Sequence, residues 1–174
     1  MILAYIWIRF EWKLATSTIL STVHDAAFVL AVFAILGHYG QLQFDLTSLA
    51  AVLAVIGYSV NDTVVVLDRI RENFRAARSG TPKEIIDQAI NQTLSRTIMT
   101  SVTTLLAVLA LYLFGGEAIH SFSFIMLIGI IVGTYSSIFI ASASALILGI
   151  KREDLLPPKK EKAEEIQEES MTYF

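Results

Sequence analysis

Long apolar stretches alternate with short polar segments along the chain. Four of these stretches are predicted to be membrane-spanning helices, at residues 14–37, 46–67, 98–114 and 122–150. Their lengths match or approach the roughly 20 residues that an α-helix needs to cross a bilayer core. The pattern therefore predicts an all-α fold, a polytopic transmembrane helix bundle. Residues 1–8 are apolar but shorter, and we interpret them as the end of a helix that begins outside this chain.

The segments between the spans are polar or amphipathic. Residues 82–95 gather apolar side chains on one side, which predicts a helix lying on the cytoplasmic surface of the membrane. Thr81, Pro82 and Glu84 favour a helix start there, because threonine caps the first turn and glutamate completes a capping box. Residues 68–80 are predicted to be a basic loop, and residues 151–174 a disordered cytoplasmic tail.

Composition agrees with the membrane assignment. The chain is 55% hydrophobic and only 17% charged, whereas soluble domains carry about 25% charged residues. There are no cysteines, which excludes disulfides and thiol chemistry. No phosphate-binding glycine loop, metal-ligand spacing or nucleophile-elbow serine is present. We therefore expect no enzymatic activity, no cofactor, no metal and no nucleic-acid partner.

The distribution of basic residues predicts the orientation. All 13 lysines and arginines fall on one side of the predicted membrane or at its edge, and the connections 38–45 and 115–121 contain none. Basic residues are retained on the cytoplasmic side. The C-terminus is therefore expected to be cytoplasmic.

Asp62 is the first candidate for chemistry, because it lies inside an apolar span about 10 Å from the cytoplasmic edge. An ionised carboxylate at such a depth must be paired, hydrated or protonated. Helical spacing places Asp62 on a small and polar stripe with Tyr58 and Asn61, facing other helices. Asp62 could carry protons, or it could be a structural side chain that fixes helix register.

Arg96 begins the following span at a similar depth and shares a face with Thr100. An arginine close to Asp62 in one state and distant in another would couple protonation to helix movement. The competing interpretation is an arginine that reaches to lipid headgroups.

His24 and Asp25 are adjacent inside the first full span. They could pair with neighbouring helices, relay protons or lie in a hydrated vestibule, and the sequence favours a structural role. A separate stripe of small residues, containing Gly129, Gly133 and Ser137, recurs every four residues in the last span. Such stripes let helix backbones approach closely, so we predict a packing seam.

Several motifs together resemble the SecF family of the bacterial Sec translocon. They are IGYSVNDTVVVLDRIRENFR, GTPKEI, QTLSRTIMTS, LYLFGG and MLIGIIVGTYSSIFIAS, with RFEW and VHD near the start. The match covers nearly all of residues 5–152, and its most specific part is the combination of NDT with SRT.

The resemblance implies a membrane domain that is half of a pseudo-two-fold assembly, similar in fold to the resistance-nodulation-division (RND) transporters. It implies an obligate partner, SecD, and use of the proton-motive force to assist export of unfolded preproteins across the bacterial cytoplasmic membrane. The SecYEG channel, YajC and YidC are further expected partners, besides protons and membrane lipids. In the family, the positions of Asp62 and Arg96 belong to the proton pathway. Family members also carry a preceding transmembrane helix and a periplasmic domain, which we expect to be missing here.

Three alternatives remain at this point. The chain could be half of another RND-type transporter that exports a small molecule or a lipid. It could be an intramembrane aspartyl protease using Asp25 and Asp62, although the GxGD surroundings of that class are absent. It could also be a passive scaffold in which Asp62 only fixes helix packing.

Overall fold

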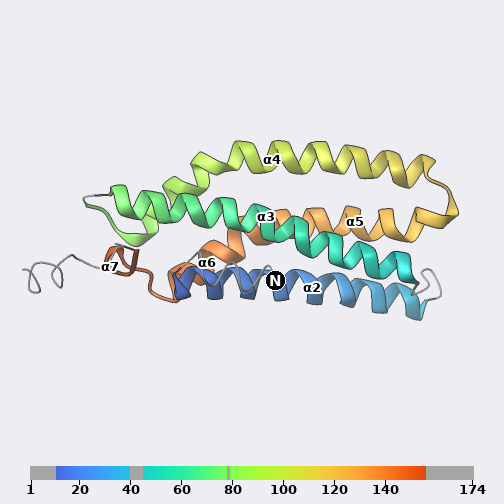
Figure 1. Ribbon diagram of the computed structural model, residues 1–174, viewed down its shortest axis with the longest axis horizontal. Coiled ribbons are helices and arrows are strands. Elements are labelled where there is room, and N and C mark those ends of the chain that lie inside the picture. Colours follow the sequence, from blue (N-terminus) through green and yellow to red (C-terminus); the bar gives the residue numbers. More distant parts are fainter. Residues whose placement is uncertain (1–10, 40–44, 78, 156–174) are drawn as a thin grey trace, which may run out of the picture.

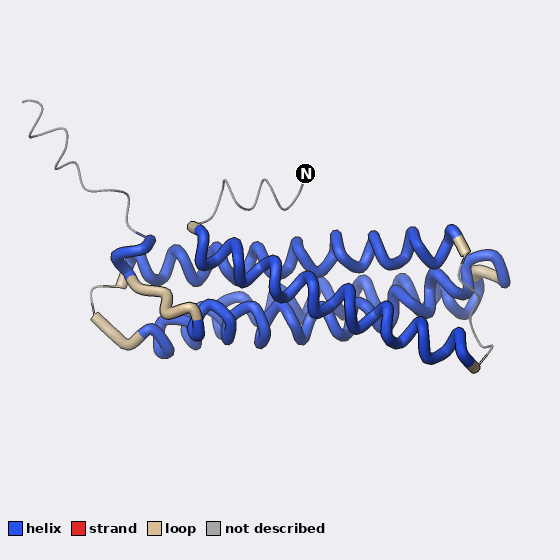
Figure 2. The backbone as a smooth tube through the Cα atoms, turned by 90° about the horizontal axis from the view of Figure 1, so that it is seen from below, coloured by secondary structure: helices blue, strands red, loops and turns tan. Residues whose placement is uncertain are grey.

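Four long helices pack side by side in the computed structural model, which describes residues 11–39, 45–77 and 79–155. All four are long and apolar enough to cross a membrane. No strand occurs in these residues (Figures 1 and 2). The helices are α2 (Trp12–His38), α3 (Leu46–Ala76), α4 (Pro82–Phe114) and a fourth made of α5 (Glu117–Tyr135), η1 (Ser136–Ile140) and α6 (Ala141–Ile147), followed by the short α7 (Arg152–Leu155).

Successive helices run in opposite directions. The start of α2, the end of α3 and the start of α4 lie at one end of the bundle, next to α6 and α7 (Figure 1). The expected partial helix at 1–8 and the expected tail beyond residue 155 lie outside the described residues.

Polar side chains begin two of the helices. The carboxylate of Asp45 accepts a hydrogen bond from the backbone N–H of Ser48 at 2.7 Å. At the start of α4, the Thr81 hydroxyl accepts from the Glu84 N–H, and the Glu84 carboxylate accepts from the Thr81 N–H. The capping box predicted at Thr81 is therefore confirmed.

The segment 82–95 is continuous with the span that follows it, since both belong to α4. In Figure 1 the first turns of α4 slant away from the axis of the rest. The Thr93 hydroxyl donates to the carbonyls of Ala89 and Ile90, at 3.0 and 3.2 Å. Hydroxyl bonds of this kind to the preceding turn often bend helices.

The loop predicted at 68–80 is wrong over its first part, because α3 continues to Ala76. Three of the arginines that suggested a loop, Arg69, Arg71 and Arg75, form ion pairs along or beside the helix. Arg69 binds Glu72 one turn away at 2.9 Å. Phe74 is fully buried, so this end of α3 also contributes to the core.

The last span contains a π-helical segment that the sequence pattern did not predict. Residues 136–140 adopt this wider helix between α5 and α6. A π-helix inserts one extra residue into an α-helix and often marks a functional position. Here it buries Ser136 and Ser137 together in the bundle.

The stripe of small residues faces α3. A Cβ built on Gly129 would lie 2.2 Å from a methyl carbon of Val55, and one on Gly133 would lie 3.2 Å from the Ser59 Cβ. Ser137, the third member, is fully buried and donates its hydroxyl to the Thr134 carbonyl at 3.0 Å.

Two apolar clusters form the core, with polar side chains between them. One surrounds Leu67 and Phe74 near the end that holds α7, and the other surrounds Val55 and Met126 in the opposite half. The positions of α2 and α3 that lie between the clusters are occupied by buried serines, threonines and aspartates.

Candidate functional site

A band of buried polar side chains lies between the two apolar clusters, and we call it the buried polar layer. Its members come from α2, α3, α4 and η1, and all are at most 5% exposed: Ser21, Asp25, Ser59, Asp62, Thr63, Thr97, Ser101 and Ser136. Polar groups that are buried without partners are costly, so each contact within this layer matters for the arrangement of the helices.

Asp62 is 5% exposed, consistent with the inward direction predicted from helical spacing. Its Oδ2 atom is buried and has no hydrogen-bond partner among the described residues, and the same holds for the hydroxyls of Thr63 and Thr97. Leaving a buried polar atom unsatisfied costs about 1–3 kcal/mol, and more if it is charged. Asp62 is therefore a buried carboxyl group that the described chain leaves only partly compensated.

Arg96 is exposed on α4 and forms no ion pair or hydrogen bond within the described chain. Its charge nevertheless interacts through space with the Asp62 carboxyl group. The structure thus brings the two predicted residues into the same region without joining them.

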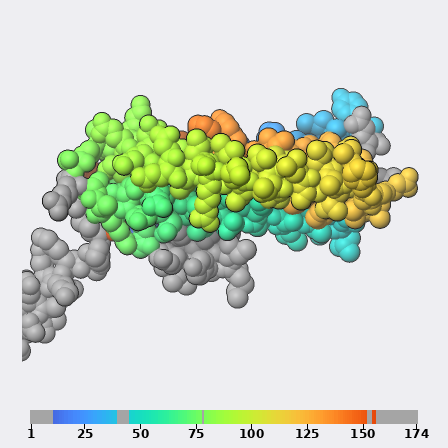
Figure 3. Space-filling model, turned by 90° about the horizontal axis from the view of Figure 1, so that it is seen from above, coloured from blue at the N-terminus to red at the C-terminus, as the bar shows by residue number. Residues whose placement is uncertain are grey.

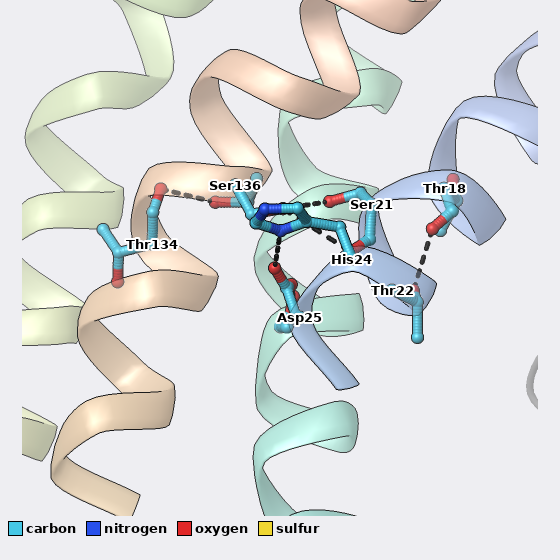
Figure 4. A network of polar contacts seen from close by, with 9 residues as sticks. Thr18, Ser21, Thr22, His24, Asp25, Thr134 and Ser136 are labelled. Carbon is cyan, nitrogen blue, oxygen red and sulfur yellow. Dashed lines mark hydrogen bonds and ion pairs between the residues drawn. The ribbon is translucent and has the colours of Figure 1, made fainter. Parts of the chain in front are cut away.

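Asp25 is fully buried and well connected. The Ser59 hydroxyl on α3 donates to its Oδ2 atom, and Nδ1 of His24 lies 3.1 Å from its Oδ1 atom. Figure 4 shows the His24 and Asp25 side chains pointing toward each other on α2. The His24 side chain is 40% exposed, so the pair extends from the bundle interior to its surface.

The π-helix contributes a second contact to the same face of α2. The hydroxyls of Ser21 and Ser136 lie 2.8 Å apart (Figure 4). Sequence reasoning missed both Ser136 and Ser59. Ser59 lies one turn before Asp62 in the GYSVND motif, and that spacing was the available signal.

Tyr58 links α3 to α4 and α5. Its hydroxyl donates to the Ser101 hydroxyl at 3.2 Å, and Ser101 lies 2.7 Å from the Thr134 hydroxyl. Of the other predicted residues, Asn61 and Thr100 are exposed in this chain, and Thr100 donates to the backbone carbonyl of Thr97.

Several ion pairs join neighbouring segments at the end of the bundle near α7. Glu11 binds Arg71 and Arg75, each at 3.1 Å, and Lys13 binds Asp154 at 2.6 Å. The hydrogen bond from Lys13 holds the pKa of Asp154 below its usual range. These contacts tie the start of α2 to the end of α3 and to α7.

The family model described as "Protein export membrane protein SecD/SecF, C-terminal" matches residues 1–151. The chain belongs to this family.

The SecD/SecF relatives include the protein translocase subunits SecF of Vibrio alginolyticus and of Haemophilus influenzae. They are 55% and 52% identical to the chain and cover 92% and 93% of it. The chain spans about half the length of each, 50% and 49%. The resemblance predicted from the sequence motifs is therefore confirmed at the level of the family.

A solved structure of a SecD/SecF protein supports the fold. The crystal structure of SecDF, a translocon-associated membrane protein from Thermus thermophilus, superposes with a TM-score of 0.78 at 45% identity. The match covers 83% of this chain and 20% of that chain. The all-α membrane bundle predicted from the apolar pattern is confirmed.

Proposed function

We propose that this chain acts as the membrane part of a SecF-type subunit, which works with SecD and uses the proton-motive force to assist preprotein export. The observation that carries the proposal is Asp62, a carboxyl group buried between two apolar clusters with the charge of Arg96 nearby. Membership of the SecD/SecF family supports the choice of protein export over other proton-driven transport.

Asp62 and Arg96 would couple protons to movement through a change of charge. An ionised Asp62 attracts the guanidinium, and a protonated Asp62 does not. A bound ligand shifts a conformational equilibrium only by its differential interaction with the two states. Here the proton is that ligand. Its binding to Asp62 removes the attraction to Arg96, so it favours the conformation in which the two side chains are farther apart. Asp62, Arg96 and the neighbouring Asn61 would form the proton pathway.

SecD is proposed as the partner that covers α4. Only 17% of the most apolar stretch of α4 is buried, and the helix runs along the length of the face seen in Figure 3. Asn61 and Arg96 are both exposed, and each lies within two helical turns of the hydrogen bond between Tyr58 and Ser101. Exposed amide and guanidinium groups at this depth would be poorly solvated by lipid, which favours a protein partner.

The orientation and the wider assembly also belong to the proposal. The end of the bundle that holds Arg69, Arg71 and Arg75 would face the cytoplasm of a bacterial cell, because basic residues are retained there. The C-terminus would lie on the same side. SecYEG would be the channel served, with YajC and YidC as accessory partners, and the subunit would act without catalysing a covalent reaction.

Asp62→Asn in the full-length protein tests the proposal. Asparagine keeps the shape of the side chain but cannot bind a proton at this position. We expect preprotein export in cells to fall while the complex with SecD still assembles. Asp68→Asn, an exposed aspartate on the same helix, is the matched control and should export normally. Normal export by the Asp62 variant in an assembled complex would overturn the proposal.

A further inference from the structure

We propose that His24 and Asp25 form a second proton-binding site, which acts in series with Asp62; this inference rests on the proposed function. Asp25 is fully buried inside a helix long and apolar enough to span a membrane. The role predicted for Asp62 does not use it, and a carboxyl group in such a place requires either compensation or a proton.

The position of Asp25 relative to Asp62 follows from the contact with Ser59. The Ser59 hydroxyl donates to Asp25, and Ser59 precedes Asp62 by three residues on α3. Three residues of α-helix correspond to about 4.5 Å along the axis. Asp25 therefore lies about one turn farther than Asp62 from the bundle end that holds α7. Protons crossing toward that end would meet the Asp25 level first.

His24 gives this site a route to its surroundings. Its side chain is 40% exposed, while Nδ1 contacts the buried Asp25 carboxylate at 3.1 Å. With the hydrogen on Nδ1, the free Nε2 atom can accept a proton from outside the chain. The Nδ1 proton then passes to Asp25 Oδ1. The net result is one proton gained by the carboxylate and a neutral imidazole whose hydrogen is now on Nε2.

Protonation of Asp25 changes the contact between α2 and α3. A carboxylate only accepts hydrogen bonds, so Ser59 must donate to it. A neutral carboxyl group has a hydrogen of its own, and the hydroxyl of Ser59 is then free to turn toward another acceptor. Asp62 lies on the same helix, about one turn from Ser59. A change in the protonation of Asp25 can therefore act on Asp62 through the Ser59 hydroxyl and one turn of α3.

The charged surroundings of Asp25 are sparse, which makes its protonation state matter. On α2 the nearest titratable side chain is His24. On α3 Tyr58 directly precedes Ser59 and donates its hydroxyl to Ser101, and the nearest carboxyl group to Ser59 is Asp62. The segments η1 and α6 contain no titratable residue. On α5, Glu117 and His120 lie in the first turns, far along the helix from Ser136, and Tyr135 is exposed.

The test uses the full-length subunit with its partner in membrane vesicles. Infrared difference spectra recorded over a pH series report the carbonyl stretch of each protonated carboxyl group. We expect Asp25→Asn to remove one titrating band that Asp62→Asn leaves in place. We also expect Asp25→Asn and His24→Gln to shift the pH profile of export, and Asp25→Glu to restore it. His38→Gln, an exposed histidine at the end of the same helix, is the matched control for His24→Gln.

Ser59→Ala keeps the test decisive if Asp25→Asn fails to fold. This variant retains the carboxyl group and removes its hydrogen-bond donor, so the titration midpoint of the Asp25 band should move. An unshifted export profile in Asp25→Asn, or spectra in which no band responds to either variant, would overturn the inference. Normal export by Asp62→Asn would instead overturn the proposed function, and the infrared result at Asp25 would stand separately.

Discussion

At Gly129 a side chain from α3 takes the place that a Cβ would occupy. The nearest methyl carbon of Val55 lies 2.2 Å from that position, whereas nothing lies within 4 Å of a Cβ built on Gly57. Glycine at 129 is therefore required by packing, and glycine at 57 is not. The two positions form a natural pair for comparison.

Gly129→Ala is expected to destabilise the bundle by about 1–3 kcal/mol, because an added methyl group forces a well-packed contact apart. Gly57→Ala is expected to stabilise it by about 0.5–1 kcal/mol, because alanine restricts the unfolded chain at an open helical position. Denaturation in mild detergent, followed by circular dichroism, measures both. Equal stability of the two variants would contradict the packing argument.

The sequence could predict the inward direction of Asp62 but not the contacts of Asp25. The NDT motif and helical spacing identify Asp62 as an inward carboxyl group, and it is 5% exposed. Asp25 is equally visible in the sequence. Its partner Ser59 is 34 residues away on another helix. The pattern of one helix does not determine how the other is rotated about its axis. Contacts between helices depend on packing that no single helix encodes.

At the scale of elements, the π-helix determines which face of the following helix, α6, is turned toward the bundle. It lies between α5, which packs Gly129 and Gly133 on α3, and α6, which buries Ala141 and Ala145. Removing one residue from a π-helix restores regular α-helix and turns the following segment by about 100°.

Deletion of Phe139, an exposed residue of η1, should therefore turn the buried face of α6 outward and lower the stability of the bundle. Phe139→Ala removes the same side chain without changing the helix register and serves as the control. The midpoint of thermal unfolding compares the two. If the deletion and the substitution unfolded at the same temperature, the π-helix would have no structural role.

The attachment of α7 should depend on pH. Because the pKa of folded Asp154 is below its usual range, folding favours the ionised carboxylate. The contact with Lys13 is then fully formed at neutral pH and is lost as the pH falls below about 4, through the folded-state pKa. The protection of residues 152–155 from hydrogen exchange, relative to the intrinsic rate at each pH, should fall in that window, and Asp154→Asn should show low protection at every pH. A wild-type exchange pattern in Asp154→Asn would contradict this assignment.

Element boundaries were predictable where local chemistry decides them. Thr81 and Glu84 satisfy backbone groups within their own turn, so the start of α4 could be read from a few residues. The end of α3 could not, because Arg71 and Arg75 bind Glu11, 60 and 64 residues away. The π-helix also escaped prediction, since its serines bond partly to another helix.

At the scale of the whole molecule, the exposed face of α4 should contact SecD. The chain contains no cysteine, so a single introduced cysteine can carry a photoactivated crosslinker at a chosen position. Met99 and Leu106 are 63% and 62% exposed, and Val108 is 5% exposed. Crosslinks to SecD are expected from positions 99 and 106 and not from the control at 108. Absence of any crosslink from both exposed positions would place SecD elsewhere.

The Ser101 contact has a consequence for how α4 can tilt. In the described chain, α4 forms hydrogen bonds to other helices through Gln92, which accepts from Asn73, and through Ser101. Arg96 lies between these two anchors, and the stretch from Val102 to Phe114 lies beyond them. We therefore expect the amplitude of α4 motion to be smallest at Arg96 and to grow toward Phe114. A small displacement of Arg96 relative to Asp62 would then be amplified along the far half of α4, toward the exposed face that we expect to contact SecD.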